Sequence, residues 1–263
     1  MRGAVSCSFA TVVKQASEDR SIASHWTATS ASPGLFARLI GVLTSPRATY
    51  KEVAARPRWA GALAVVLLVT AAGVGAFMST EAGRLALLDY QITMLESFGR
   101  RPDDAQTLRM EKRGADRASL GVAGEAVAVV SAVLLVIAGV ALAIFNLFLD
   151  GTATFKQVFS VVAHSSFVLV VQQIVVLPLD YAHESLTSPT NLAVFVSFLD
   201  DDTLIARLLG SIDLFFVWWL ASLAIGLSVL YKRRTASTAA AILGVYVAIA
   251  LVLAAVKTTL SGA

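Results

Sequence analysis

The sequence predicts an all-α integral membrane protein, a bundle of five transmembrane helices with an amphipathic cytoplasmic elbow before the first span. Hydrophobic residues make up 57% of the 263-residue chain and charged residues only 15%, whereas soluble domains carry about 45–50% and about 25%. The mean hydropathy is +0.74. The charges are also clustered, so that long segments contain none. Such segments must be helical in a bilayer, because lipid offers no partner to free backbone groups.

Five apolar segments are long enough to cross the hydrocarbon core, which takes about 20 helical residues. They cover residues 59–79, 123–149, 157–179, 208–231 and 235–256. The third is expected to end at Pro178, because proline disrupts a helix. The fourth contains one charged residue, Asp213. Residues 191–199 form an apolar run that is too short to cross, and we expect a buried or interfacial helix there.

Basic residues predict the orientation, because Lys and Arg are retained in cytoplasmic loops. Residues 1–58 contain eight Lys or Arg against three acidic residues, and residues 232–234 are all basic, whereas residues 180–206 contain no Lys or Arg. We therefore expect the N-terminus in the cytoplasm, the C-terminus outside and the chain in the inner (plasma) membrane. Residues 1–33 are rich in Ser, Ala and Thr, which predicts a disordered cytoplasmic tail rather than a cleaved signal peptide. Residues 257–263 form a short C-terminal tail.

Residues 34–58 predict the amphipathic elbow. An apolar segment is followed by Pro46, which is tolerated in the first turn of a helix, and Pro57 ends this second helix. The basic side chains of the elbow can contact anionic headgroups or a partner protein, and they are Arg47, Lys51, Arg56 and Arg58. Two interpretations stay open. The elbow is either a docking surface or an anchor that only orients the first span.

The connection between the first two spans, residues 80–123, carries apolar residues at helical spacing. They are Leu85, Leu88, Ile92 and Leu95. The pattern predicts a helical hairpin over the outer mouth of the bundle, acting as a solvated connector or as a substrate lid.

Few polar groups lie at membrane depth, where they are costly and mark functional sites. With the orientation above, the outer half of the bundle contains the candidate polar group Glu125, Gln172, Gln173 and Asp213. It predicts either a proton- or cation-linked transport site or interhelical hydrogen bonds, each worth about 0.6–2 kcal/mol. His164 lies about two turns into the third span, and Asn146 lies near the inner end of the second.

Motifs of catalytic and cofactor sites do not occur in the sequence. It has no HExxH, GxSxG or phosphate-binding loop. The single cysteine, Cys7, excludes an intramolecular disulfide and a cysteine-built metal site. The three histidines lie on distant segments, at His25, His164 and His183. We therefore expect no enzymatic activity, no cofactor, no metal and no nucleic-acid partner, and a lipid bilayer as the surroundings.

Small residues four apart permit close approach of helix backbones. They recur at Ser222 and Gly226, and again at Ala240, Gly244 and Ala248. We expect them to pack spans four and five within the bundle or to form a homo-oligomer.

Four sequence features stand in a fixed order along the chain. They are LIGVLTSPRATYKEVAARPRWAGAL before the first span, GTATFKQVFSVVAHSSF entering the third, SIDLFFVWWLASLAIGLSVLY for the fourth, and a short basic turn before the fifth. Together they resemble the bacterial branch of the Yip-type (Ypt-interacting protein) membrane domain family, over roughly Leu35 to Val256. The most specific parts are Ser45-Pro46-Arg47, the Gly151…Phe155…Gln157 turn and the Asp213…Phe215…Trp218 group.

The resemblance implies five spans and a cytoplasmic N-terminal region. Eukaryotic members of the family are linked to Rab-type GTPases and early secretory membranes, but that role does not transfer to the bacterial branch. We expect a non-enzymatic membrane scaffold or adaptor. The alternative is a small-solute or ion transporter built around Asp213, although transporters usually show repeat symmetry and broken helices.

Overall fold

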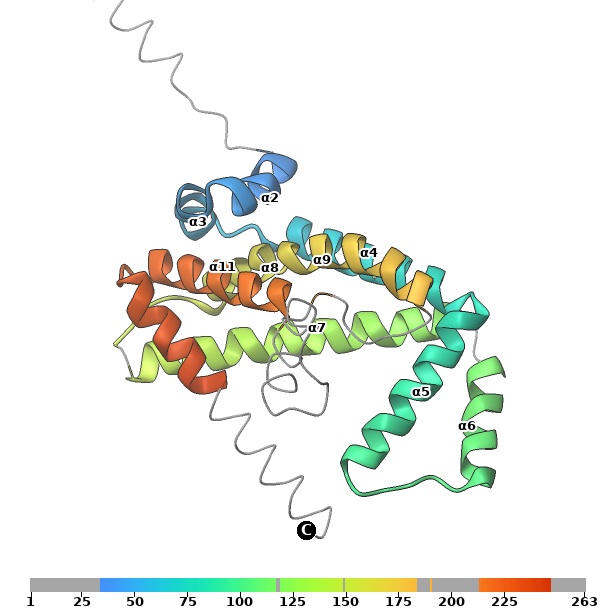
Figure 1. Cartoon of the computed structure of the whole chain (residues 1–263). Coiled ribbons are helices and arrows are strands. Elements are labelled where there is room, and N and C mark those ends of the chain that lie inside the picture. Colours follow the sequence, from blue (N-terminus) through green and yellow to red (C-terminus); the bar gives the residue numbers. More distant parts are fainter. Residues whose placement is uncertain (1–33, 117–118, 149, 184–189, 191–212, 247–263) are drawn as a thin grey trace, which may run out of the picture. The chain divides into compact units, whose positions relative to one another are not determined.

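The structure is a computed structural model, and it describes residues 34–116, 119–148, 150–183, 190 and 213–246. The elements within these residues are helices (Figure 1). The chain divides into two compact units, residues 1–37 and residues 38–263. The predicted tails, residues 1–33 and 257–263, and the short apolar run 191–199 lie outside the described residues.

Two short helices form the elbow. They are α2, Leu35–Thr44, and α3, Pro46–Ala55. Ser45 is the N-cap of α3 and Pro46 its first helical residue, a position where the missing amide of proline costs nothing. Arg56 ends the helix just before Pro57. The helix predicted from Pro46 is therefore confirmed.

Three helices are long and apolar enough to cross a membrane, within the residues that the structure describes. They run over Trp59–Met78, Ser119–Phe148 and Phe155–Ala182. The first is α4, Trp59–Met78; the second is α7, Ser119–Ala143, continued by the π-helix η1, Ile144–Phe148. The third consists of α8, Phe155–Ser165, and α9, Phe167–His183. The predicted helical fold is thus confirmed for the residues that the structure describes, and three of its helices have the length and composition of membrane-spanning helices.

Two shorter apolar helices lie where the fourth and fifth spans were predicted. They are α11, Leu214–Leu230, and a helix over Thr235–Tyr246. The remainder of these predicted spans, residues 208–212 and 247–256, lies outside the described residues.

The third long helix differs from the prediction in two respects. Pro178 does not end it, because α9 continues through Pro178 to His183. A proline inside a helix removes one hydrogen bond and is tolerated in membrane helices, where neighbouring groups satisfy the freed carbonyl.

The interruption occurs instead at Ser166, between α8 and α9. The hydroxyls of Ser165 and Ser166 both donate to the carbonyl of Val162, at 2.9 Å each. The Leu169 amide then donates to the carbonyl of Ser166, three residues back. Serine side chains that compete for helical carbonyls bend or break a helix, so the serine pair explains the break.

The predicted hairpin between the first two spans is confirmed as α5, Glu81–Ser97, and α6, Asp104–Asp116. Thr80 caps α5 by accepting a hydrogen bond from the Gly83 amide at 3.0 Å. Asp103 accepts the Gln106 amide at 2.6 Å. Such capping satisfies amides that have no partner inside the helix.

Helix α8 forms the centre of the packed core. All its residues from Val158 to Ser165 are buried, and it contacts α3, α4, α7 and α11. A helix that is buried all round needs small or apolar residues on every face, and α8 has valines, an alanine and serines there. The remaining core comes from these neighbours, with Tyr50, Leu134, Phe145, Trp219 and Leu227 among its buried residues.

Candidate functional site

The elbow is held against the bundle by buried side chains, of which Tyr50 is the largest. Tyr50, on α3, is fully buried, and its hydroxyl shares a hydrogen bond of 2.7 Å with the hydroxyl of Ser222 on α11. Burial raises the pKa of Tyr50 well above its ordinary value. The tyrosine ring fits because residue 226 is glycine, where an added Cβ would lie 3.0 Å from Cε1 of Tyr50 and against Val161 of α8.

Both ends of α3 are bonded as well. At its start, the Arg47 guanidinium donates to the Thr235 hydroxyl at 2.9 Å. At its end, the amide of the Gln157 side chain donates to the carbonyl of Ala54 at 3.4 Å. Helix α3 therefore has a fixed position against α8 and α11.

The turn between η1 and α8 is locked to the end of α11 by Asn146 and Tyr231. The Asn146 side-chain amide donates to the carbonyl of Ala153 at 2.9 Å, and its oxygen accepts the Tyr231 hydroxyl at 3.0 Å. The rings of Phe145 and Tyr231 stack with centroids 4.8 Å apart. A Cβ at Gly151 would lie 2.5 Å from the Tyr231 ring. The close approach explains the glycine.

We call this assembly the junction: helix α3, the turn 150–154 with the start of α8, and the end of α11 through Thr235. It brings together two of the three motifs that were most specific in the sequence. Ser45-Pro46-Arg47 begins α3, and Gly151…Phe155…Gln157 forms the turn. The third motif, Asp213…Phe215…Trp218, lies at the opposite end of α11.

A capping box begins α8. The Thr154 hydroxyl accepts the Gln157 amide, and the Gln157 side chain accepts the Thr154 amide at 2.9 Å. We expect Thr154→Ala to lower the free energy of unfolding in detergent by about 1 kcal/mol. Thr152→Ala, at an exposed residue of the same turn, is the matched control. Equal thermal shifts for the two variants would show that the box does not stabilise the turn.

Exposed basic side chains surround the junction. The four predicted from the elbow, Arg47, Lys51, Arg56 and Arg58, are all exposed. Four more come from residues next to the junction's bonded groups: Lys156, Lys232, Arg233 and Arg234. We call these eight residues the basic rim. Both groups of basic residues can be seen in the sequence. The Arg47–Thr235 and Ala54–Gln157 hydrogen bonds, however, are needed to show that the two groups lie at one site.

The candidate polar group of the outer half is spread over three helices. Glu125 is exposed on α7, whereas Gln172 and Gln173 are half-buried on α9. The Gln173 side chain packs over Gly73 of α4, where an added Cβ would lie 2.5 Å from its amide nitrogen.

Asp213 was predicted inside the fourth span, but the structure places it at a helix start. It is the N-cap of α11 and accepts the Phe216 amide at 3.0 Å. Its second oxygen accepts the Thr190 hydroxyl at 2.6 Å. An aspartate just before an apolar run often marks the start of a helix. The carboxylate of Asp213 therefore stabilises the first turn of α11.

His164 is fully buried in the last turn of α8. Its Nδ1 donates to the carbonyl of Ser160 at 2.7 Å, which fixes the ring within its own helix. Among the described residues, no group of three His, Cys, Asp or Glu side chains can hold a metal ion. His25 and the side chain of His183 lie outside the described part of the chain.

Comparison with known families gives a match that covers the whole junction. A family model for the Yip1 domain matches residues 40–256. The chain belongs to the Yip1 domain family. No curated protein and no solved structure matched in the same comparisons. The Yip1 match includes α3, the turn before α8 and α11, so the junction lies within the domain that defines the family.

Proposed function

We propose that this Yip1-domain protein is a non-enzymatic membrane scaffold or adaptor whose docking surface is the basic rim of the junction. One observation carries the proposal. Helix α3 is fixed by the buried Tyr50 and by bonds at both its ends, while its basic side chains remain exposed. A surface that is already ordered loses little conformational freedom when a partner binds.

The same observation argues against the interpretation that the elbow is only an anchor for the first span. An anchor depends on lipid contact to hold its place. Here α3 is held by protein contacts with α8 and α11, so its charges do not have to bind lipid in order to position the first span. They are available to an anionic partner.

The proposal includes the topology expected from the charges. The chain crosses the plasma membrane five times, with α11 and the helix from Thr235 in the fourth and fifth spans. The elbow and the basic rim face the cytoplasm, and the C-terminus lies outside. Two basic segments, residues 47–58 and 232–234, lie at the same junction. Their proximity supports this orientation, because both segments are then on the cytoplasmic side, where Lys and Arg are retained.

Transport through Asp213 receives less support from the contacts. The carboxylate caps α11 and accepts the Thr190 hydroxyl, so binding a proton or a cation there would disturb the helix start. The break at Ser166 and the π-helix show that interrupted helices do occur in this chain, and interrupted helices alone do not identify a transporter.

Neutralising part of the rim tests the proposal. We expect Lys51→Gln/Arg56→Gln/Arg58→Gln to weaken partner capture about tenfold, because exposed charge pairs contribute roughly 0.2–1 kcal/mol each. Capture is measured by a photoreactive residue at Ala55, which is exposed on α3, followed by affinity purification and mass spectrometry from intact cells.

The matched control removes three exposed basic residues from the α5–α6 hairpin, Arg100→Gln/Arg101→Gln/Arg109→Gln. It should leave the crosslinked partner unchanged. Equal loss in both triple variants, or no reproducible crosslink to any protein, would contradict the scaffold proposal.

A further inference from the structure

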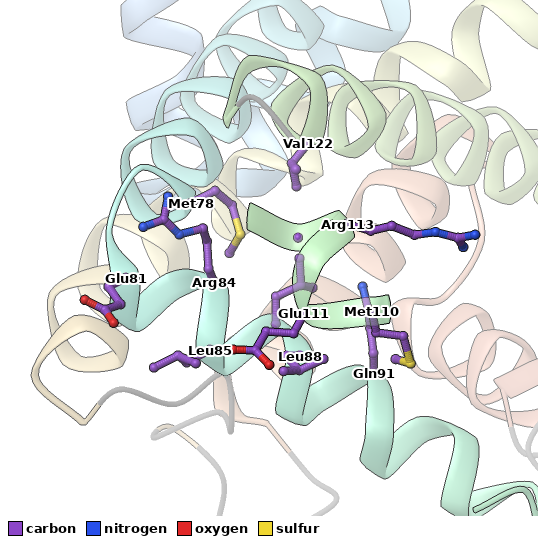
Figure 2. Close-up of a pocket in the computed structure, with 12 residues that line it drawn as sticks. Met78, Glu81, Arg84, Leu85, Leu88, Gln91, Met110, Glu111, Arg113 and Val122 are labelled. Atoms are coloured by element: carbon purple, nitrogen blue, oxygen red, sulfur yellow. The ribbon is translucent and has the colours of Figure 1, made fainter. Parts of the chain in front are cut away.

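A pocket of about 840 Å³ lies at the other end of the long helices, away from the junction. It is lined by the end of α4, the start of α7 and the facing sides of α5 and α6 (Figure 2). Its volume falls in the range of known small-molecule sites, roughly 300–1,000 Å³.

The pocket has an apolar floor and a charged rim. Met78, Leu88, Met110 and Val122 form the floor, and they are buried or half-buried. Glu81 and Arg84 on α5, with Glu111 and Arg113 on α6, carry the charges, and all four are exposed. In Figure 2, Glu111 lies beside Leu85 and Leu88, while Arg84 and Arg113 extend to opposite sides of the pocket. A ligand that fits such a site has an apolar part and charges of both signs.

The pocket lies where lipid headgroups are expected. Met78 is the last residue of α4, and Val122 is in the first turn of α7. Both helices are apolar enough to cross a membrane and bury little of their surface within the protein. Their ends therefore meet the level at which the apolar core of a bilayer gives way to headgroups.

We propose that this pocket binds the headgroup of a zwitterionic phospholipid that carries a primary ammonium, of the phosphatidylethanolamine class. The ammonium donates to the carboxylate of Glu111 or Glu81, and the phosphate accepts from Arg84 or Arg113. Such charge-assisted hydrogen bonds are roughly twice as strong as neutral ones. The glycerol and upper acyl chain cover the apolar floor.

Charge complementarity selects this class over its alternatives. A purely anionic headgroup would face two carboxylates, and a purely cationic ligand would face two guanidinium groups, so each would meet repulsion. A choline headgroup has both charges but no N–H to donate to a carboxylate. A soluble zwitterion leaves the apolar floor uncovered.

The test uses the full-length protein, purified in detergent and titrated with each ligand separately, with bound ligand measured by native mass spectrometry. We expect phosphatidylethanolamine to bind at least about tenfold more tightly than phosphatidylcholine, phosphatidylglycerol or glycerophosphoethanolamine without acyl chains. Arg84→Gln/Arg113→Gln and Glu81→Gln/Glu111→Gln should each abolish this preference.

The control is Glu96→Gln/Arg109→Gln, which removes one exposed charge of each sign from α5 and α6 outside the pocket and should bind like the unmodified chain. All these side chains are exposed, so thermal unfolding should be unchanged in every variant. Equal binding of the four ligands would overturn the proposal, and so would tighter binding of phosphatidylglycerol or of the acyl-free headgroup. Retention of the preference in both pocket variants would overturn it as well.

Discussion

Replacing Tyr50 by alanine is expected to release α3 from the bundle and to lower the free energy of unfolding by about 3–5 kcal/mol. The substitution leaves a cavity between α3, α8 and α11, and it deprives the buried Ser222 hydroxyl of its partner at 2.7 Å. Unfolding in detergent, followed by circular dichroism, measures the loss. Protease cleavage near Arg56 should also become faster, because the freed segment is then accessible.

Tyr50→Phe is the matched control, since it keeps the ring and removes only the hydroxyl. It should cost about 1 kcal/mol. Because burial raises the pKa of Tyr50 above the ordinary value of 10.0, folding stabilises the protonated hydroxyl. This contribution is complete below pH 10 and falls as the pH rises further. Similar stability of the alanine and phenylalanine variants would mean that the ring is not packed in the bundle.

Replacing Gly226 by valine is expected to force α3, α8 and α11 apart. Even a Cβ at this position would lie against Val161 and 3.0 Å from the Tyr50 ring. Overpacking of this kind costs about 1–3 kcal/mol. Gly139→Val, on α7, is the control, because a Cβ there has no neighbour within 4 Å among the described residues.

The comparison of the two valine variants is made in the same detergent, by thermal unfolding and by the yield of monodisperse protein. Gly226→Val should be clearly the less stable. If the two variants unfold together, then Gly226 does not lie at a close contact between helices.

Much of the fold follows from the distribution of charge and proline along the chain. The charge-free segments predict α4, α7 and the joined α8–α9 helix, and Pro46 and Pro57 predict the limits of α3. These features are local, since a helix start or an apolar run is complete within a few residues. The hairpin α5–α6 follows from helical spacing for the same reason.

The break in the third long helix was not predicted, because only Pro178 was considered as a residue that interrupts the helix. Pro178 is accommodated inside α9, whereas the hydroxyls of Ser165 and Ser166 disrupt the helix by bonding to Val162. Asp213 was expected inside a helix because the apolar run was read from Leu208. Its position directly before LFFVWW is the signal of an N-cap.

The junction itself could not be read from the sequence. Tyr50 and Ser222 are separated by 172 positions, and Arg47 and Thr235 by 188, so nothing local indicates that they meet. Ser222 and Gly226 were expected to pack the fourth span against the fifth or to form a homo-oligomer. In the structure, Ser222 and Gly226 contact Tyr50 of the elbow, and Gly226 also contacts Val161 of the third long helix. Small residues predict that another helix or side chain packs closely against them, but they do not identify that neighbour.

The central claim is that the elbow is a fixed part of the bundle, and crosslinking of α3 to the end of α11 tests it most directly. The pair Arg47→Cys/Thr235→Cys is introduced into a Cys7→Ser background, and membranes are treated with a short bismaleimide. The Arg47 guanidinium and the Thr235 hydroxyl lie 2.9 Å apart, so we predict rapid intramolecular crosslinking, seen as a linked peptide by mass spectrometry. The control pair Arg109→Cys/Thr235→Cys places one thiol beyond the far end of α4, a helix of 20 residues that is about 30 Å long. Crosslinking of the first pair that is no faster than that of the control pair would contradict a fixed elbow.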